Sequence, residues 1–185
     1  MKDFESLLQN RRSTRKFTQQ LLNPEQVEKI LKAGLMAPAS KRKNPWQFVV
    51  VEDKETLKKL AESKPAGSAF LEGCALAVVV LGNVMESDVW IEDASIAAIL
   101  MQLQAEDLGL GSCWCQIRNR QREDESEAED YVRALLDIPY QLGVLCILGF
   151  GYKDQKNRPF DESRLQWEKI HLGSYRLPET NAPES

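Results

Sequence analysis

The chain of 185 residues contains a single histidine, His171, and this scarcity excludes several kinds of site. A metal centre built from histidines is excluded, and so is a Ser–His pair unless His171 itself serves. The four cysteines form no Cys-x-x-Cys pair and lie in apolar sequence, so we interpret them as reduced, buried thiols of a cytoplasmic protein. We therefore expect no metal site and no catalytic triad.

Long hydrophobic runs and the usual nucleotide-binding glycine patterns are also missing. No stretch of about 18 apolar residues occurs and the first residues lack the apolar core of a secretory signal, so we expect no membrane association. Gly149-Phe150-Gly151 lacks the third glycine of the dinucleotide fingerprint, and no Gly-Lys-Ser or Gly-Lys-Thr is present. A net charge of -4 argues against nucleic acid as a partner. A bound phosphate would have to be held by discrete side chains.

Apolar periodicity predicts helices that alternate with buried strands. Helical spacing follows the candidate N-caps Asp3, Asn23 and Asp53, and the second of these helices should end before Pro38. Further helices are expected over 88–108 and 131–136, and strands over 48–51, 76–81, 113–117 and 142–150. This alternation indicates an α+β or α/β sandwich around one sheet. Without a linker or repeat, residues 1–176 should form one domain, followed by a loose tail over 177–185.

The helix expected over 88–108 is apolar on nearly all sides. A helix of this kind must be buried on more than one face. A central core helix and the contact face of a dimer explain the pattern equally well, and the sequence leaves both open.

Positive charge is concentrated at two places in this acidic chain. Residues 11–16, Arg-Arg-Ser-Thr-Arg-Lys, carry four cations and two hydroxyls. A guanidinium group can bind two phosphate oxygens at once. A second cluster, Lys156-Asn157-Arg158, follows the last expected strand. Each cluster alone fits a solvated charged surface, but two clusters that converge would suit one phosphate.

Two loops place polar groups beside aromatic ones. Residues 37–46, Ala-Pro-Ala-Ser-Lys-Arg-Lys-Asn-Pro-Trp, offer a hydroxyl, a guanidinium and an amide ahead of an expected strand. Residues 109–114, Gly-Leu-Gly-Ser-Cys-Trp, form a tight turn into another strand. A simple connection with Trp46 in the core explains the first loop as well as a ligand contact does.

Taken together and in order, five motifs resemble those of the nitroreductase family of FMN-dependent oxidoreductases. The resemblance spans residues 4–176. The motifs are Arg-Arg-Ser-x-Arg at 11–15, Ala-Pro-x-Ser-x-x-x-x-Pro-Trp at 37–46, Asp-Ala-Ser-Ile-Ala-Ala at 93–98, Leu-Gly-Leu-Gly-Ser-Cys-Trp at 108–114, and Leu-Asp-Ile-Pro at 136–139 ahead of Gly-Phe-Gly-Tyr at 149–152.

This resemblance implies an α+β fold, a central and mostly antiparallel sheet wrapped by helices, in an intertwined homodimer with FMN at the interface. The helix over 88–108 would be the dimer helix. NADH or NADPH would supply hydride to the flavin N5, which would pass it in a ping-pong reaction to a flat acceptor such as a nitroaromatic or a quinone. The flavin carries this chemistry, which agrees with a chain that shows no catalytic side chain.

The resemblance also implies which residues contact the cofactor. Arg11 and Ser13 would bind the FMN phosphate together with Lys156 and Arg158, and Arg12 would line the same segment. Arg15 would approach the N1/O2 edge of the flavin, and Cys115-Gln116-Ile117 would pass its N5. Ser40 and Arg42 would lie against the ribityl chain and ring, from the partner subunit.

Some positions depart from the family pattern. Arg42, Asn44 and Ala39 stand where many relatives have Asn, Gln and Ser, and Ile117 stands where many have glycine beside N5. The charge of Arg42 could meet the flavin, an anionic substrate or solvent. Two other functions stay open: a specialised flavin enzyme of the same fold, of the dehalogenase or flavin-fragmenting type, and a non-catalytic FMN-binding or sensing protein.

Overall fold

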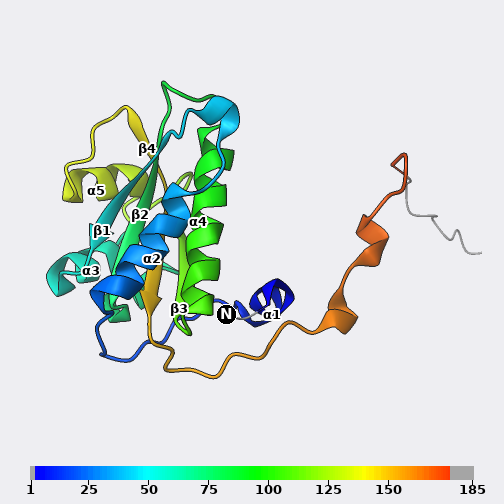
Figure 1. Cartoon of the computed structure of the whole chain (residues 1–185). Helices are drawn as coiled ribbons and strands as arrows, with labels where there is room; N and C mark the ends of the chain where they lie inside the picture. The colour runs from blue at the N-terminus through cyan, green and yellow to red at the C-terminus, as the bar shows by residue number, and fades with distance from the viewer. Residues whose placement is uncertain (1–2, 176–185) are drawn as a thin grey trace, which may run out of the picture.

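The centre of the protein is a four-stranded antiparallel sheet with strand order β1-β2-β4-β3, shown in Figure 1 as a computed structural model that describes residues 3–175. The strands are β1 (Trp46–Val51), β2 (Leu76–Asn83), β3 (Gly111–Gln116) and β4 (Leu142–Gly151). The helices are α1 (Phe4–Asn10), α2 (Pro24–Leu35), α3 (Lys54–Ala61), α4 (Trp90–Asp107) and α5 (Ala128–Leu135). The α+β class and the antiparallel sheet predicted from the sequence are confirmed.

Local sequence determines where the first three helices begin. The side chains of Asp3, Asn23 and Asp53 each accept a hydrogen bond of 2.8 Å from a backbone N–H three residues further on. At α2 the Gln26 side chain completes a capping box, and Pro24 occupies the first helical position. All three predicted N-caps are therefore confirmed.

Helices cover both faces of the sheet, and this explains why the two central strands are apolar throughout. α2 and α4 lie on one face, and α3 and α5 lie on the other (Figure 1). Every residue of β4 is buried, and so are seven of the eight residues of β2. Strands with both faces covered show continuous hydrophobic runs, which is the pattern that identified them in the sequence.

The long helix α4 is a core helix within the single chain. Ala94, Ala98, Met101 and Ala105 are fully buried in the cluster formed with β2 and β4. On its outer side Ile96 and Ile99, with neighbouring leucines, keep much of their surface exposed. Burial against the sheet accounts for one apolar face of the helix and leaves the other face uncovered.

Several element boundaries differ from the sequence prediction by one to three residues, and the starts of β3 and α5 are two of them. β3 begins at Gly111, two residues before the expected start, because Gly111 pairs with Gly151 of β4 and Ser112 also bridges Ser13. α5 begins at Ala128, three residues before the start of the helix expected over 131–136.

Beyond Tyr152 the chain leaves the sheet. Residues 159–175 form an arm that runs away from the body of the protein, with two short 3-10 turns (Figure 1). The arm exposes Leu165, Trp167, Ile170, Leu172 and Tyr175. The tail predicted for 177–185 lies outside the described residues. Within residues 3–175 no helix is long and apolar enough to cross a membrane.

Candidate anion and cofactor site

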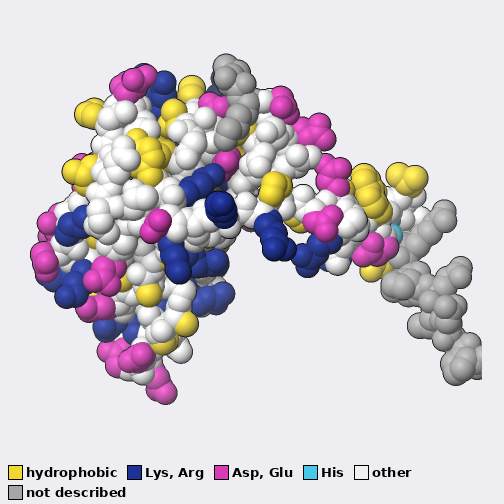
Figure 2. Space-filling view, turned by 90° about the horizontal axis from the view of Figure 1, so that it is seen from below, with side chains coloured by type: hydrophobic (Ala, Val, Ile, Leu, Met, Phe, Trp, Pro, Cys, Tyr) yellow, Lys and Arg dark blue, Asp and Glu magenta, His cyan; other side chains and the backbone are white. Residues whose placement is uncertain are grey.

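The two basic segments, 11–16 and 153–158, lie side by side. The backbone N–H groups of Arg15 and Lys16 donate to the Gln155 side chain (2.9 and 3.0 Å), and the Asp154 N–H donates to the Lys16 carbonyl (2.9 Å). Figure 2 shows Lys and Arg side chains gathered on the face from which the C-terminal arm leaves. The convergence that the sequence raised as one alternative is therefore present.

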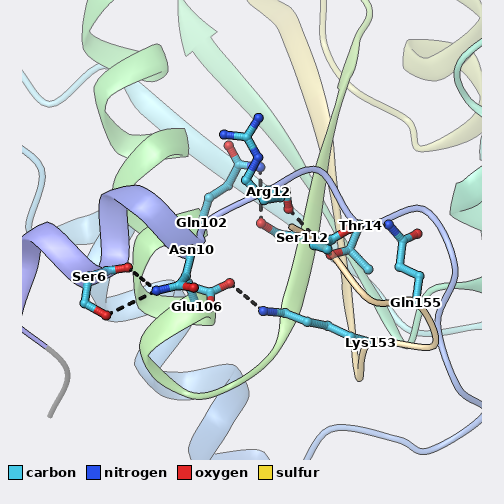
Figure 3. Close-up of polar contacts among 10 residues, drawn as sticks. Ser6, Asn10, Arg12, Thr14, Gln102, Glu106, Ser112, Lys153 and Gln155 are labelled. Atoms are coloured by element: carbon cyan, nitrogen blue, oxygen red, sulfur yellow. Dashed lines mark hydrogen bonds and ion pairs between the residues drawn. The ribbon is translucent and has the colours of Figure 1, made fainter. Parts of the chain in front are cut away.

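The start of β3 holds the first basic segment in place. The Thr14 N–H donates to the Ser112 carbonyl (2.9 Å), and Ser13 forms a parallel bridge with Ser112. Behind this bridge the Gln102 side chain of α4 donates to the Ser112 hydroxyl (3.2 Å), as Figure 3 shows. The basic segment is thus fixed to the edge strand of the sheet and, through it, to the core helix.

A buried ion pair supports the second basic segment. The Lys153 ammonium lies 2.6 Å from the carboxylate of Glu106, which is 4% exposed at the last turn of α4. Both basic segments are therefore attached to the same end of α4 (Figure 3).

Apart from Lys153, the cations of the two segments have no carboxylate partner within residues 3–175. In the part of the chain that the structure describes, none of the following forms an ion pair: Arg11, Arg12, Arg15, Lys16, Lys156 and Arg158. The Arg12 guanidinium instead lies 5.5 Å from the centre of the Phe160 ring. Like charges held together without counter-charges favour binding of an anion.

One thiol of β3, that of Cys113, borders this cluster, because Ser13 bridges the neighbouring residue Ser112, whereas Cys115 is fully buried in the core. Burial raises the pKa of Cys113, and the Arg15 guanidinium and the Ser13 side chain oppose that shift. Burial raises the pKa of Cys115 to about 11, against the opposing charge of Lys64. Lys64, from the loop after α3, is a neighbour that the sequence analysis missed, because nothing local connects it to β3.

The rest of the stretch that we expected beside the flavin N5 already has partners within the chain. The Gln116 side chain accepts from the Trp114 indole (2.9 Å) and donates to the Arg118 carbonyl (3.0 Å). The Ile117 N–H donates to the Leu145 carbonyl (3.2 Å), and its side chain is fully buried in the core. Ile117 therefore fills the core and brings no bulk to the surface of β3.

The loop that carries Ser40 and Arg42 lies at the other end of α4. Its Ser40 N–H donates to the buried carboxylate of Asp93 (2.9 Å), which also accepts from the Ser87 hydroxyl (3.2 Å). Asp93 and Gln102 are nine residues apart on one helix, a separation of roughly 14 Å. One chain therefore does not bring Ser40 and Arg42 to the basic segments.

This loop has a strained backbone. Lys41, Arg42 and Asn44 all have positive φ, at 52°, 56° and 47°. Left-handed conformations at residues other than glycine cost about 1–3 kcal/mol each and persist only where the surroundings impose them. The bond from Ser40 to Asp93 is one such constraint, and it makes Asp93 a second residue that the sequence analysis did not single out.

A cleft of ≈ 670 Å³ opens beside Arg15. Phe17 and Phe70 contribute apolar surface to it. Its charged lining is mixed, with four cations and three carboxylates: Arg15, Lys16, Lys54, Lys58, Glu55, Glu72 and Asp154. Its volume lies within the range of ligand-binding pockets, about 300–1,000 Å³. The basic cluster therefore adjoins a space large enough for the rest of a phosphorylated ligand.

Comparisons with known proteins agree with this geometry. Residues 8–67 and 62–152 match the nitroreductase family. A protein of Archaeoglobus fulgidus, named as a candidate NADH dehydrogenase/NAD(P)H nitroreductase, is 34% identical over 176 residues, which cover 92% of this chain and 98% of the relative.

Solved structures are also similar. An FMN-dependent nitroreductase from Clostridium difficile R20291 superposes with a TM-score of 0.90 at 43% identity, covering 93% of this chain and all of that one. A candidate NADH oxidase from Clostridium acetobutylicum has a TM-score of 0.83 at 26% identity, covering 91% and 99%. The nitroreductase-like fold is therefore confirmed, and this chain belongs to the nitroreductase family.

Proposed function

We propose that the protein is an FMN-dependent NAD(P)H oxidoreductase that reduces a flat acceptor such as a nitroaromatic or a quinone. The observation that carries the proposal is the pair of converging basic segments, in which every cation except Lys153 lacks a carboxylate partner within residues 3–175. The names of the relatives support it, since one similar structure is called an FMN-dependent nitroreductase and the relatives are named for NADH or NAD(P)H.

The residues present fit FMN. Its terminal phosphate carries nearly two negative charges, which suits Arg11, Ser13, Lys156 and Arg158 as a set of donors. A hydrogen bond to a charged group is worth about 1.5–3 kcal/mol, so three or four such bonds supply a large share of the roughly 8 kcal/mol of micromolar binding. The phosphate accounts for cations that the fold itself leaves unpaired.

The other proposed residues orient the cofactor and tune it. Arg15, which lines the adjoining cleft, is proposed to face the N1/O2 edge of the ring, where a positive charge favours the anionic reduced form. Arg12, Cys115 and Gln116 would border the same site. When bound, FMN supplies the hydride chemistry, with NADH or NADPH as donor, and the protein provides binding and electrostatics.

A homodimer is part of the proposal. An apolar groove of ≈ 550 Å³ lies between α1, α2 and α4, lined by Phe4, Leu7, Met36, Leu100 and Leu103 among others. Phe4 and Met36 are 64% and 74% exposed, and the outer face of α4 continues the apolar surface. A second copy would cover this face and bring the loop of Ser40 and Arg42 to the basic segments. Four unpaired thiols support a cytoplasmic location.

An anaerobic absorbance titration tests the function. FMN-loaded protein is titrated with NADH and then with NADPH while the visible flavin band is followed. Rapid bleaching that a quinone or nitroaromatic reverses supports the proposal and identifies the donor. Bound flavin that both nicotinamides leave oxidised refutes the NAD(P)H activity and favours a specialised flavin enzyme or a sensor. Protein that fails to bind FMN at micromolar concentration refutes the cofactor assignment.

A further inference from the structure

Three uncharged side chains join the two basic segments, and we call them the amide bridge: Gln155, Asn157 and Thr14. The Gln155 oxygen accepts from the backbone N–H groups of Arg15 and Lys16 (2.9 and 3.0 Å). Its amide nitrogen donates to the Asn157 oxygen (2.5 Å), and the Asn157 amide nitrogen donates to the Thr14 hydroxyl (2.9 Å). Thr14 is fully buried against the start of β3. Figure 3 labels Thr14 and Gln155, the two end members of the amide bridge.

Chemistry fixes the direction of every bond in the amide bridge. A backbone N–H can only donate, so the Gln155 oxygen must face Arg15 and Lys16. Its NH₂ group then faces Asn157, which must present its oxygen and turn its own NH₂ group to Thr14. Only this arrangement satisfies all the groups, so the bridge defines one relative position of the two segments.

The residues of the amide bridge alternate with those proposed to bind FMN. Thr14 stands between Ser13 and Arg15, and Lys156 stands between Gln155 and Asn157. Fixing the backbone at Thr14, Gln155 and Asn157 therefore fixes the points from which the neighbouring cations and the Ser13 hydroxyl extend.

The bridge also preserves the charge of the cluster. Carboxylates could hold two cationic segments together, but they would cancel part of the positive charge that a phosphate needs. Amides and a hydroxyl hold the segments without that cost. Binding then does not have to bring the cations together against their mutual repulsion, and a preorganised site of this kind binds more tightly.

We propose that Gln155 and Asn157 are positioning residues for recognition of the cofactor's terminal phosphate, acting through Thr14 and the backbone of Arg15 and Lys16. This inference rests on the proposed FMN function and deepens it. It requires that the bridge contributes more to the affinity for FMN than to the affinity for riboflavin, which shares the ring edge proposed to face Arg15 but has no phosphate.

The test measures dissociation constants for FMN and riboflavin by quenching of flavin fluorescence. Gln155→Ala and Asn157→Ala should each weaken FMN binding at least tenfold and weaken riboflavin binding several-fold less than FMN binding. The double variant should lose little more than either single variant, since both interrupt the same bridge. Gln141→Ala is the matched control: Gln141 is exposed, and its side chain forms no hydrogen bond within residues 3–175.

Thr14 provides a second test that keeps the shape of the site. Thr14→Val removes the hydroxyl that accepts from Asn157 and should weaken FMN at least fivefold, whereas Thr14→Ser retains that acceptor and should stay within twofold of wild type. Equal losses for FMN and riboflavin, or unchanged FMN affinity in both alanine variants, overturn the positioning role. Wild-type protein that binds no FMN refutes instead the function on which the inference rests.

Discussion

Gly111 offers the sharpest test of how the basic segment is held. A Cβ at this position would lie 2.6 Å from Thr14 Cγ2 and 2.7 Å from both Thr14 Cβ and Oγ1. Carbon atoms pack best at about 3.5–4.0 Å, so the overlap is close to 1 Å. Because Cβ of Thr14 is itself among the contacts, rotation of the Thr14 side chain cannot relieve the overlap. Gly111→Ala must therefore move the Thr14 backbone away from β3.

The size of the effect follows from what moves with Thr14. Overpacking of a buried position lowers the free energy of unfolding by about 1–3 kcal/mol. At this chain length each kcal/mol lowers the melting temperature by about 2–4 °C, so we expect the melting temperature to fall by about 2–12 °C. The same shift displaces Ser13 and Arg15 from the proposed cofactor. Loss of one charge-assisted bond, about 1.5–3 kcal/mol, weakens FMN binding by about ten- to a hundredfold.

Thermal unfolding and an FMN titration measure the two effects separately, and Gly109 provides the control. Gly109 has φ +77° with nothing within 4 Å of its Cβ position, so Gly109→Ala strains the backbone without touching Thr14. It should lower stability by about 1–2 kcal/mol and leave FMN affinity unchanged. If Gly111→Ala binds FMN like wild type, the anion site does not depend on this contact and the reasoning is wrong.

Three further predictions address the charges, the strained loop and the thiols. Arg11→Ala combined with Arg158→Ala should weaken FMN at least a hundredfold while circular dichroism shows an unchanged fold; full flavin occupancy would contradict the phosphate assignment. Asp93→Ala removes the acceptor for the Ser40 N–H, so trypsin should cut after residues 41–43 faster than in wild type. Asp93→Asn keeps an acceptor and should be cut at the wild-type rate. Equal rates in all three proteins would show that Asp93 does not hold the loop. Burial raises the pKa of the Cys115 thiol to about 11, above the value of about 8.5 for an unfolded thiol. The resulting contribution to the free energy of unfolding is fully present below about pH 8.5 and is lost as the pH rises through 11. Urea unfolding at pH 8 and at pH 10.5 should therefore show that the free energy of unfolding falls more for wild type than for Cys115→Ala. Equal falls would refute the link between the buried thiol and stability.

Sequence predicted most of the fold because most of its signals are local. The N-caps at Asp3, Asn23 and Asp53 act within three residues, and the apolar runs of β2 and β4 report burial on both faces. The start of β3 was harder to place. Glycine and serine have low strand propensity, and the pairing of Gly111 and Ser112 with β4 and with Ser13 overrides it.

The candidate site was only partly accessible to the same reasoning. Charge alone indicated two basic segments, and the resemblance supplied their roles. Gln155 and Asn157 carry no such signal, since polar residues after a strand are typical of any loop. Their bonds join positions 139–143 residues apart, and no local pattern encodes a contact at that separation.

The attachment of residue 15 to residue 155 also has a consequence for biosynthesis. β1 and β2 are neighbours in sequence and can pair early, whereas the basic segment at 11–16 gains its counterpart only after residue 155 has left the ribosome. Until then its cations remain exposed on an incomplete nascent chain. Binding of the proposed cofactor would therefore follow synthesis of residue 155, and messages truncated before that residue would yield chains that retain the first basic segment but cannot complete the proposed site.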